Sequence, residues 1–147
     1  MVIFNIQLPI FPTIAFLCAI AVFLGCEVKS DMAPVRGKVL FNGQPLKFGS
    51  VMFQPEFGQP ARSIIRPDGT FELWTEIEGD GARIGKNEIR VTCFEGQRPD
   101  ARRGEGEPSL GRSLIPLKYT MFAHSGLTHV VQPGGHTDVV LELMEEE

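Results

Sequence analysis

Residues 66–75, Arg-Pro-Asp-Gly-Thr-Phe-Glu-Leu-Trp-Thr, decide the fold class of this 147-residue chain. The segment 67–69 predicts a turn, because proline presets φ, aspartate caps the backbone and glycine accepts a positive φ. The residues that follow alternate, with Phe71 and Leu73 on one side of the backbone and Glu72 on the other. Alternation with a period of two predicts a half-buried β-strand rather than a helix.

The same alternation recurs on both sides of this stretch. It predicts strands over residues 35–41, 50–54, 61–66, 70–75, 86–94, 127–131 and 137–143. Asn42-Gly43 and the Pro-Gly-Gly segment at 133–135 supply turns between them. No segment shows the period of a convincing amphipathic helix. Short strands separated by glycine- and proline-containing turns predict an all-β fold, a small antiparallel sandwich.

The inward-facing apolar residues of these strands form the predicted core. Its members are Val35, Val39, Phe41, Val51, Phe53, Phe71, Leu73, Ile89, Val91, Val139, Leu141 and Leu143. The chain length favours one domain over two. A domain of this size can bury a core without disulfides.

The amino-terminal segment differs in composition from the rest of the chain, because no Lys, Arg, Asp or Glu precedes Glu27. Its best apolar stretch, residues 14–24, has the length of a signal-peptide core and is short for a membrane span. The end of this stretch, Phe-Leu-Gly-Cys at 23–26, resembles a bacterial lipobox. The resemblance implies cleavage before Cys26 and a diacylglyceryl anchor on its sulfur. An uncleaved membrane helix and ordinary secretion are the alternatives, and all three imply export.

We therefore expect a signal peptide at residues 1–25, a tether at 26–33 and a β-sandwich at 34–147. Cys93 is then the only other cysteine of the mature chain, so an internal disulfide is excluded. It shares the apolar face of a strand with Ile89 and Val91, which predicts a buried, inert thiol.

The sequence offers little that predicts chemistry. The spacing of His124, His129 and His136 does not suit a zinc site, which needs three or four converging ligands. The acidic segment 76–80 lacks the ligand spacing of a calcium loop, so a solvated loop is the better interpretation. We find no nucleophile-elbow or phosphate-loop motif and expect no catalytic residue, metal or cofactor. A net charge of −4 gives no reason to expect nucleic acid as a partner.

One aromatic residue suggests a binding surface. Trp74 is the only tryptophan and faces outward relative to Phe71 and Leu73. It forms a candidate binding patch with Phe57, and Phe48 or Phe122 could extend it. The opposite interpretation is that Trp74 packs under the segment 76–85.

Two further segments stand apart from the strand pattern. Residues 98–113 are rich in arginine and glycine and contain only two hydrophobic residues, Ala101 and Leu110. A long loop of this kind is either functional or simply mobile, and we favour mobility. Tyr119 precedes a Ser-Gly turn at 125–126, where its hydroxyl could bond to backbone as in a tyrosine corner.

Several phrases, in a fixed order, resemble a known family. They are Pro-Val-Arg-Gly-Lys-Val at 34–39, Asn-Gly-Gln-Pro-Leu at 42–46, Gly-Ser-Val-Met-Phe-Gln-Pro at 49–55, Arg-Pro-Asp-Gly-Thr-Phe-Glu-Leu at 66–73, Gly-Asp-Gly-Ala at 79–82, Gly-Lys-Asn-Glu-Ile-Arg-Val at 85–91, Ile-Pro-Leu-Lys-Tyr at 115–119, Ser-Gly-Leu-Thr at 125–128 and Val-Gln-Pro-Gly at 131–134. The order is similar to that of the small planctomycete lipoproteins with carboxypeptidase-regulatory-like or transthyretin-like domains. The resemblance covers nearly all of residues 22–143. It implies a seven-stranded Greek-key sandwich of the transthyretin (prealbumin) type, export and lipid anchoring, and no established activity.

Transthyretin-like folds include one enzyme class, the hydroxyisourate hydrolases, which end in a Tyr-Arg-Gly-Ser type of tail. This chain ends in Leu-Met-Glu-Glu-Glu at 143–147, so an enzyme is not expected. We predict an exported, lipid-anchored module of the cell envelope with a non-catalytic structural or protein-binding role. The alternative is a module that binds carbohydrate or another small ligand. Glu27, next to the acylated cysteine, favours the outer membrane over the cell membrane, with the domain in the periplasm or at the cell surface.

Overall fold

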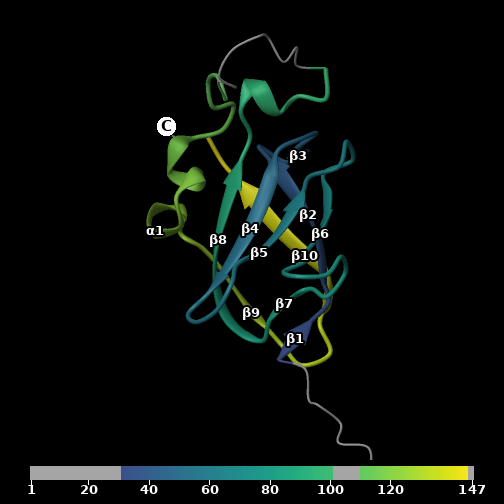
Figure 1. The fold of residues 1–147 in the computed structure, drawn as a ribbon. Coiled ribbons are helices and arrows are strands. Elements are labelled where there is room, and N and C mark those ends of the chain that lie inside the picture. Colours follow the sequence, from purple (N-terminus) through teal and green to yellow (C-terminus); the bar gives the residue numbers. More distant parts are fainter. Residues whose placement is uncertain (1–30, 101–109, 146–147) are drawn as a thin grey trace, which may run out of the picture.

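The computed structural model describes residues 31–100 and 110–145, which fold into two facing β-sheets (Figure 1). The first, named here the β2 sheet, contains β10 (His136–Leu143), β2 (Val35–Phe41), β3 (Gln44–Pro45) and β6 (Thr70–Glu72). The second, the β4 sheet, contains β5 (Ala61–Ile64), β4 (Ser50–Pro55), β8 (Gly85–Thr92) and β9 (Leu127–Val131). A short pair, β1 (Met32–Ala33) with β7 (Ala82–Arg83), lies at one end. The predicted all-β sandwich is confirmed.

Pairing within the sheets is antiparallel with one exception. β10 pairs parallel with β2, from Val139 opposite Gly37 to Leu143 opposite Phe41. The purely antiparallel prediction is wrong at this pair. Nearly the whole domain separates β2 from β10 in sequence, so no hairpin imposes an antiparallel direction on them.

The predicted strand at 70–75 is shorter in the structure because the chain changes sheets there. The Leu73 N–H still donates to the Val35 carbonyl of the β2 sheet, at 2.9 Å. One residue later, Trp74 exchanges backbone hydrogen bonds of 2.8 and 3.0 Å with Arg62 of β5. This crossing segment, residues 70–74, joins the edges of the two sheets on that side of the sandwich.

The turns have the geometry that their residues predicted. Asn42 and Gly43 have φ values of 50° and 74°, which suits the tight hairpin between β2 and β3. Asp68 accepts hydrogen bonds from the Thr70 N–H at 3.0 Å and the Thr70 hydroxyl at 2.7 Å. These hydrogen bonds hold the pKa of the Asp68 carboxyl below its ordinary value.

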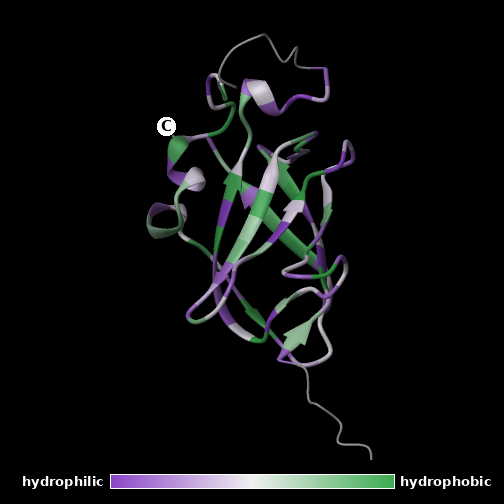
Figure 2. Cartoon of the chain, viewed as in Figure 1, coloured by the Kyte–Doolittle hydropathy of each residue, from purple (hydrophilic) through white to green (hydrophobic). Residues whose placement is uncertain are grey.

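The core between the sheets follows the predicted alternation. Every predicted core residue is buried except Phe41, which is half-buried at the end of β2 and packs against the core. Figure 2 shows the hydrophobic colour concentrated on the strands and the hydrophilic colour on the connecting loops. Burial of these apolar side chains is the main stabilising term of the sandwich.

The predicted boundary between tether and domain is wrong by at least two residues. Met32 and Ala33 form β1, and Ala33 is buried in the core. Asp31 accepts a backbone hydrogen bond from Ile84 and forms an ion pair with Arg83. Sequence periodicity could not reveal a two-residue strand. Residues 26–30, Cys26 among them, and the segment 1–25 lie outside the described residues.

Two helical turns lie alongside β8 (Figure 1). A 3-10 helix at Leu117–Thr120 leads into α1 (Phe122–Ser125), beside β8. Tyr119 is buried, and its hydroxyl accepts from the Met144 N–H at 3.0 Å and donates to the Met144 carbonyl at 3.3 Å. The predicted backbone anchor at Tyr119 is therefore present.

Residues 110–113, at the end of the segment 98–113, pair with the backbone of residues 94–96. Leu110 and Arg112 accept hydrogen bonds from the N–H groups of Gly96 and Glu95. Ser113 bridges Phe94. Simple mobility of this loop stays a prediction, and residues 101–109 lie outside the described part of the chain. In the two described ranges, no helix has the length and apolar character needed to cross a membrane.

Candidate functional site

A row of five side chains crosses the outer face of the β4 sheet. β4 is central, and its Met52 lies opposite Arg62 of β5 on one side and Arg90 of β8 on the other. Trp74 bridges Arg62 at the edge of the sheet. Residues at the same register position of neighbouring strands point to the same face. We call Trp74, Arg62, Met52, Arg90 and Phe122 the arginine–aromatic row.

Each arginine of the row lies over an aromatic ring. The Arg62 Cζ is 4.1 Å from the centroid of the Trp74 ring, and the Arg90 Cζ is 5.1 Å from that of Phe122. The Arg90 Nε and Nη2 atoms also approach the Met52 sulfur, at 3.3 and 3.0 Å. Stacking of this kind fixes the guanidinium plane, and it leaves available to a ligand the N–H groups of Arg62 and those of Arg90 that do not face Met52.

The two guanidinium groups lack an acidic partner. Among the described residues, no carboxylate oxygen lies within 4.0 Å of a nitrogen of Arg62 or Arg90. Arg62 is exposed and Arg90 is half-buried. The row therefore presents two positive charges on a chain whose net charge is −4.

Two shallow hollows lie beside Trp74, and both are also lined by Ser63 and Ile64. One, of about 370 Å³, is completed by Ser50, Met52 and Arg62. The other, of about 420 Å³, is completed by Arg66, Glu72, Glu78 and Gly79. Ile64 is 77% exposed and contributes apolar surface to both. Hollows of this size suit a small polar ligand or one unit of a polymer.

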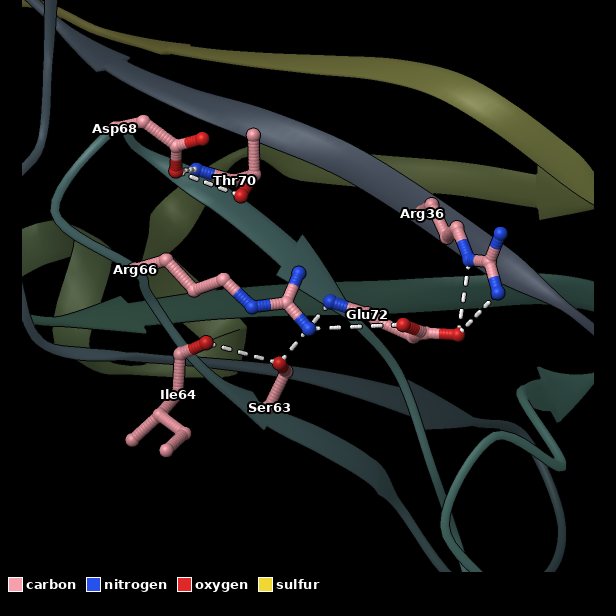
Figure 3. Close-up of polar contacts among 7 residues, drawn as sticks. All are labelled: Arg36, Ser63, Ile64, Arg66, Asp68, Thr70 and Glu72. Carbon is pink, nitrogen blue, oxygen red and sulfur yellow. Dashed lines mark hydrogen bonds and ion pairs between the residues drawn. The ribbon is translucent and has the colours of Figure 1, made fainter.

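An ion-pair network borders the second hollow (Figure 3). Glu72 Oε1 accepts from the Arg36 Nε and Nη2 at 2.8 and 2.6 Å, and Glu72 Oε2 lies 3.6 Å from the Arg66 Nη2. The hydrogen bond from Arg36 is the largest cause that holds the pKa of Glu72 below its ordinary value. Ser63 Oγ accepts from the Glu72 N–H at 3.2 Å and donates to the Ile64 carbonyl at 3.0 Å.

The predicted patch of Trp74 with Phe57 is not assembled. Trp74 is half-buried and stacks on Arg62, whereas Phe57, 74% exposed in the loop after β4, lines neither hollow beside Trp74. The alternative, in which Trp74 packs under the segment 76–85, is met only in that Glu78 and Gly79 line a hollow with it. A binding role of Trp74 stays a prediction; Arg62, which stacks on its ring, was not visible in sequence because strand pairing brings the two together.

In the acidic segment 76–80, Asp80 stabilises the turn by accepting backbone hydrogen bonds. Asp80 accepts hydrogen bonds from the N–H groups of Thr75, Glu76 and Ile77, at 2.6, 2.9 and 3.0 Å. Burial opposes ionisation of Asp80, but these backbone donors outweigh it and hold the carboxyl pKa below its ordinary value. Within the described residues, no three His, Cys, Asp or Glu side chains converge as metal ligands would.

Two of the histidines meet inside the sandwich. The rings of His129 and His136 lie edge to face, with centroids 4.7 Å apart. Burial, together with His136, lowers the pKa of His129. Its Nε2 and the Oδ1 of buried Asn87 have no hydrogen-bond partner in the described part of the chain.

Cys93 lies where the alternation predicted it. It is buried, and burial raises the pKa of its thiol to about 11. A thiol with so high a pKa is a poor nucleophile at neutral pH, as the predicted inert role requires.

Comparison with known proteins gives weak likenesses. No family profile and no curated protein matches the chain. A DUF3823 family protein from Parabacteroides merdae is 20% identical with a TM-score of 0.40, over 78% of this chain and 46% of that protein. The dioxygenase domain of a dioxygenase carbohydrate-binding protein fusion from Streptomyces sp. SirexAA-E is 17% identical with a TM-score of 0.33, over 82% of this chain and 84% of that one. The chain thus spans less than half of the first structure.

Proposed function

We propose that this chain is a non-catalytic binding module of the bacterial cell envelope, held on a membrane by a lipid on Cys26, that binds its partner through the arginine–aromatic row. The observation that carries the proposal is the pair of stacked guanidinium groups without a carboxylate partner among the described residues. Stacking on aromatic rings spends none of their hydrogen-bonding capacity on an internal acid.

The surroundings of the row support a binding role. Ile64 and Trp74 add apolar surface beside the charges, and both residues line the two hollows. Aromatic residues and arginine are the residue types most enriched at the centres of binding interfaces. The lipobox-like segment at 23–26 supports the anchor.

Site-specific crosslinking tests the proposal. A photo-crosslinking amino acid replaces Ile64, beside the row, or Val140, which is 60% exposed on β10 of the other sheet. We expect covalent adducts in intact cells from position 64 and few from position 140. Equal yields at the two positions, or none at 64, would refute a partner on this face.

Mass spectrometry of the mature amino terminus tests the anchor separately. A diacylated peptide beginning at Cys26 is expected, and a Cys26→Ser variant should leave the membrane fraction. An unmodified peptide that runs through residues 18–26 would contradict lipid anchoring.

A further inference from the structure

The charge and spacing of the row define what it can bind. Two guanidinium groups without an internal acid favour an anionic ligand, because a charged acceptor forms stronger hydrogen bonds with them than a neutral one does. Arg62 and Arg90 lie on strands separated by β4, so their backbones are about 10 Å apart, twice the strand spacing. A ligand that contacts both guanidinium groups therefore offers at least two acidic groups on one side.

The flat outer face of the sheet favours a polymer over a small metabolite. The row runs across β5, β4 and β8, and the hollows near one end are open to solvent and shallow. A ligand laid along the row crosses the strands at right angles. It meets Trp74 and Ile64 at one end and Phe122 at the other.

Repeat length separates the classes of acidic polymer. Side chains on one face of an extended peptide recur every two residues, about 6.6–6.8 Å, which is closer than the backbones of the two arginines. In an extended two-fold polysaccharide, alternate sugars face the same way, so their carboxylates recur at the longer disaccharide repeat. Uronic acid carboxylates offer the planar, bidentate acceptor that arginine recognises best. The apolar faces of sugar rings also suit Trp74 and Ile64.

We propose that the arginine–aromatic row binds an acidic polysaccharide whose carboxylates engage Arg62 and Arg90. This inference rests on the proposed binding function and names its ligand class. The attraction between the two positive charges of the row and the polymer is electrostatic, so added salt should weaken binding.

The single tryptophan makes the site directly observable. Trp74 is the only tryptophan in the chain, and Arg62 lies over its ring. A carboxylate that draws the guanidinium toward itself changes the surroundings of the indole. Tryptophan emission therefore reports on this site alone.

The test titrates the full-length chain in detergent with polygalacturonate, followed by Trp74 emission and by co-sedimentation. Saturable binding is expected. The fully methyl-esterified polymer, which has the same backbone without charge, should bind at least tenfold more weakly. The double variant Arg62→Gln/Arg90→Gln should also lose at least tenfold in affinity.

The matched control is Lys38→Gln/Lys47→Gln, which removes the same charge outside the row and should change affinity less than twofold. Unfolding midpoints of all variants verify that each is folded. Equal losses in the two double variants would overturn the proposal. So would the absence of polygalacturonate binding, or tighter binding to poly-glutamate or to phosphatidylglycerol vesicles. Crosslinking from position 64 without polygalacturonate binding would refute the ligand class and leave the binding function standing, whereas failure of both would refute both.

Discussion

Two neighbouring groups of arginines in the sandwich use the same residue type in opposite ways. Beside the β2 sheet, Arg36 donates to Glu72, and Arg66, from the loop before β6, lies near the other oxygen of the same carboxylate (Figure 3). On the β4 sheet, Arg62 and Arg90 stack on aromatic rings and have no carboxylate nearby among the described residues. An ion pair neutralises an arginine, whereas an aromatic ring orients it and preserves its charge.

The comparison shows that counting charges does not identify a binding face. One carboxylate, Glu72, lies beside two arginines and offsets part of their charge. Among the described residues, Arg62 and Arg90 have aromatic rings beside them and no carboxylate. What distinguishes the two groups of arginines is the partner of each side chain, a carboxylate in one group and an aromatic ring in the other.

The largest expected effect comes from the crossing segment that joins the two sheets. Leu73 is fully buried. Its own N–H bonds to Val35 of the β2 sheet, and the next residue, Trp74, bonds to Arg62 of the β4 sheet. Leu73→Ala should lower the free energy of unfolding by about 2–5 kcal/mol, because it removes buried methyl groups and leaves a cavity. Chemical denaturation measures this loss of unfolding free energy. The fluorescence emission of Trp74 should also shift, because its pairing with Arg62 loosens. Val140→Ala, at an exposed position, is the control, and an equal loss there would contradict a special role for the crossing segment.

A smaller effect is expected from Glu72, which pairs with Arg36 and lies near Arg66. Its pKa is lowered in the folded chain, chiefly by the hydrogen bond from Arg36. The carboxylate thus stabilises the fold above the ordinary value of 4.5, and this contribution is lost as the pH falls through the folded-state pKa. Glu72→Gln should cost at most about 1 kcal/mol at neutral pH, because the pair is partly exposed. The difference from wild type should vanish in acid.

Glu72→Gln also tests whether Arg36 and Arg66, without their carboxylate partner, can bind an anion as we propose for the arginine–aromatic row. Freed of Glu72, Arg36 and Arg66 would carry unpaired charge, so Glu72→Gln should gain weak affinity for polygalacturonate. Glu56→Gln, at an exposed glutamate outside the ion pairs of the described chain, is the control. A pH profile in which Glu72→Gln and wild type differ by a constant amount would contradict the assigned role.

The smallest effect on stability is expected from a substitution in the arginine–aromatic row. Arg62→Gln removes a cation–π contact at an exposed position, worth about 0.5–1 kcal/mol at most. The emission of Trp74 should move to longer wavelength and be quenched more easily by acrylamide, because the indole loses its cover. Arg112→Gln, whose guanidinium lies near Glu95 far along the chain from Trp74, should leave the emission unchanged. An unshifted emission spectrum in Arg62→Gln would show that Arg62 does not cover the ring in solution.

Local features of the fold could be predicted from the sequence, but the row could not. Period-two alternation revealed the strands and the buried core, and residue chemistry revealed the turns at Asn42 and Asp68 and the anchor at Tyr119. These signals act over a few residues. The parallel pairing of β2 with β10 and the alignment of Met52 with Arg62 and Arg90 depend on register between distant strands, which one sequence does not encode locally. The outward phase of Trp74 was the one visible sign of the site.

The position of β2 has a mechanical consequence. β1 leads through Pro34 into β2, which is bonded to β10 on one side and to β6 on the other. A pull on the chain at Asp31 first meets the β1–β7 pair and the contacts of Asp31 with Ile84 and Arg83. Only when these open does the force reach β2, which is hydrogen-bonded along both of its edges, so the strand resists extraction.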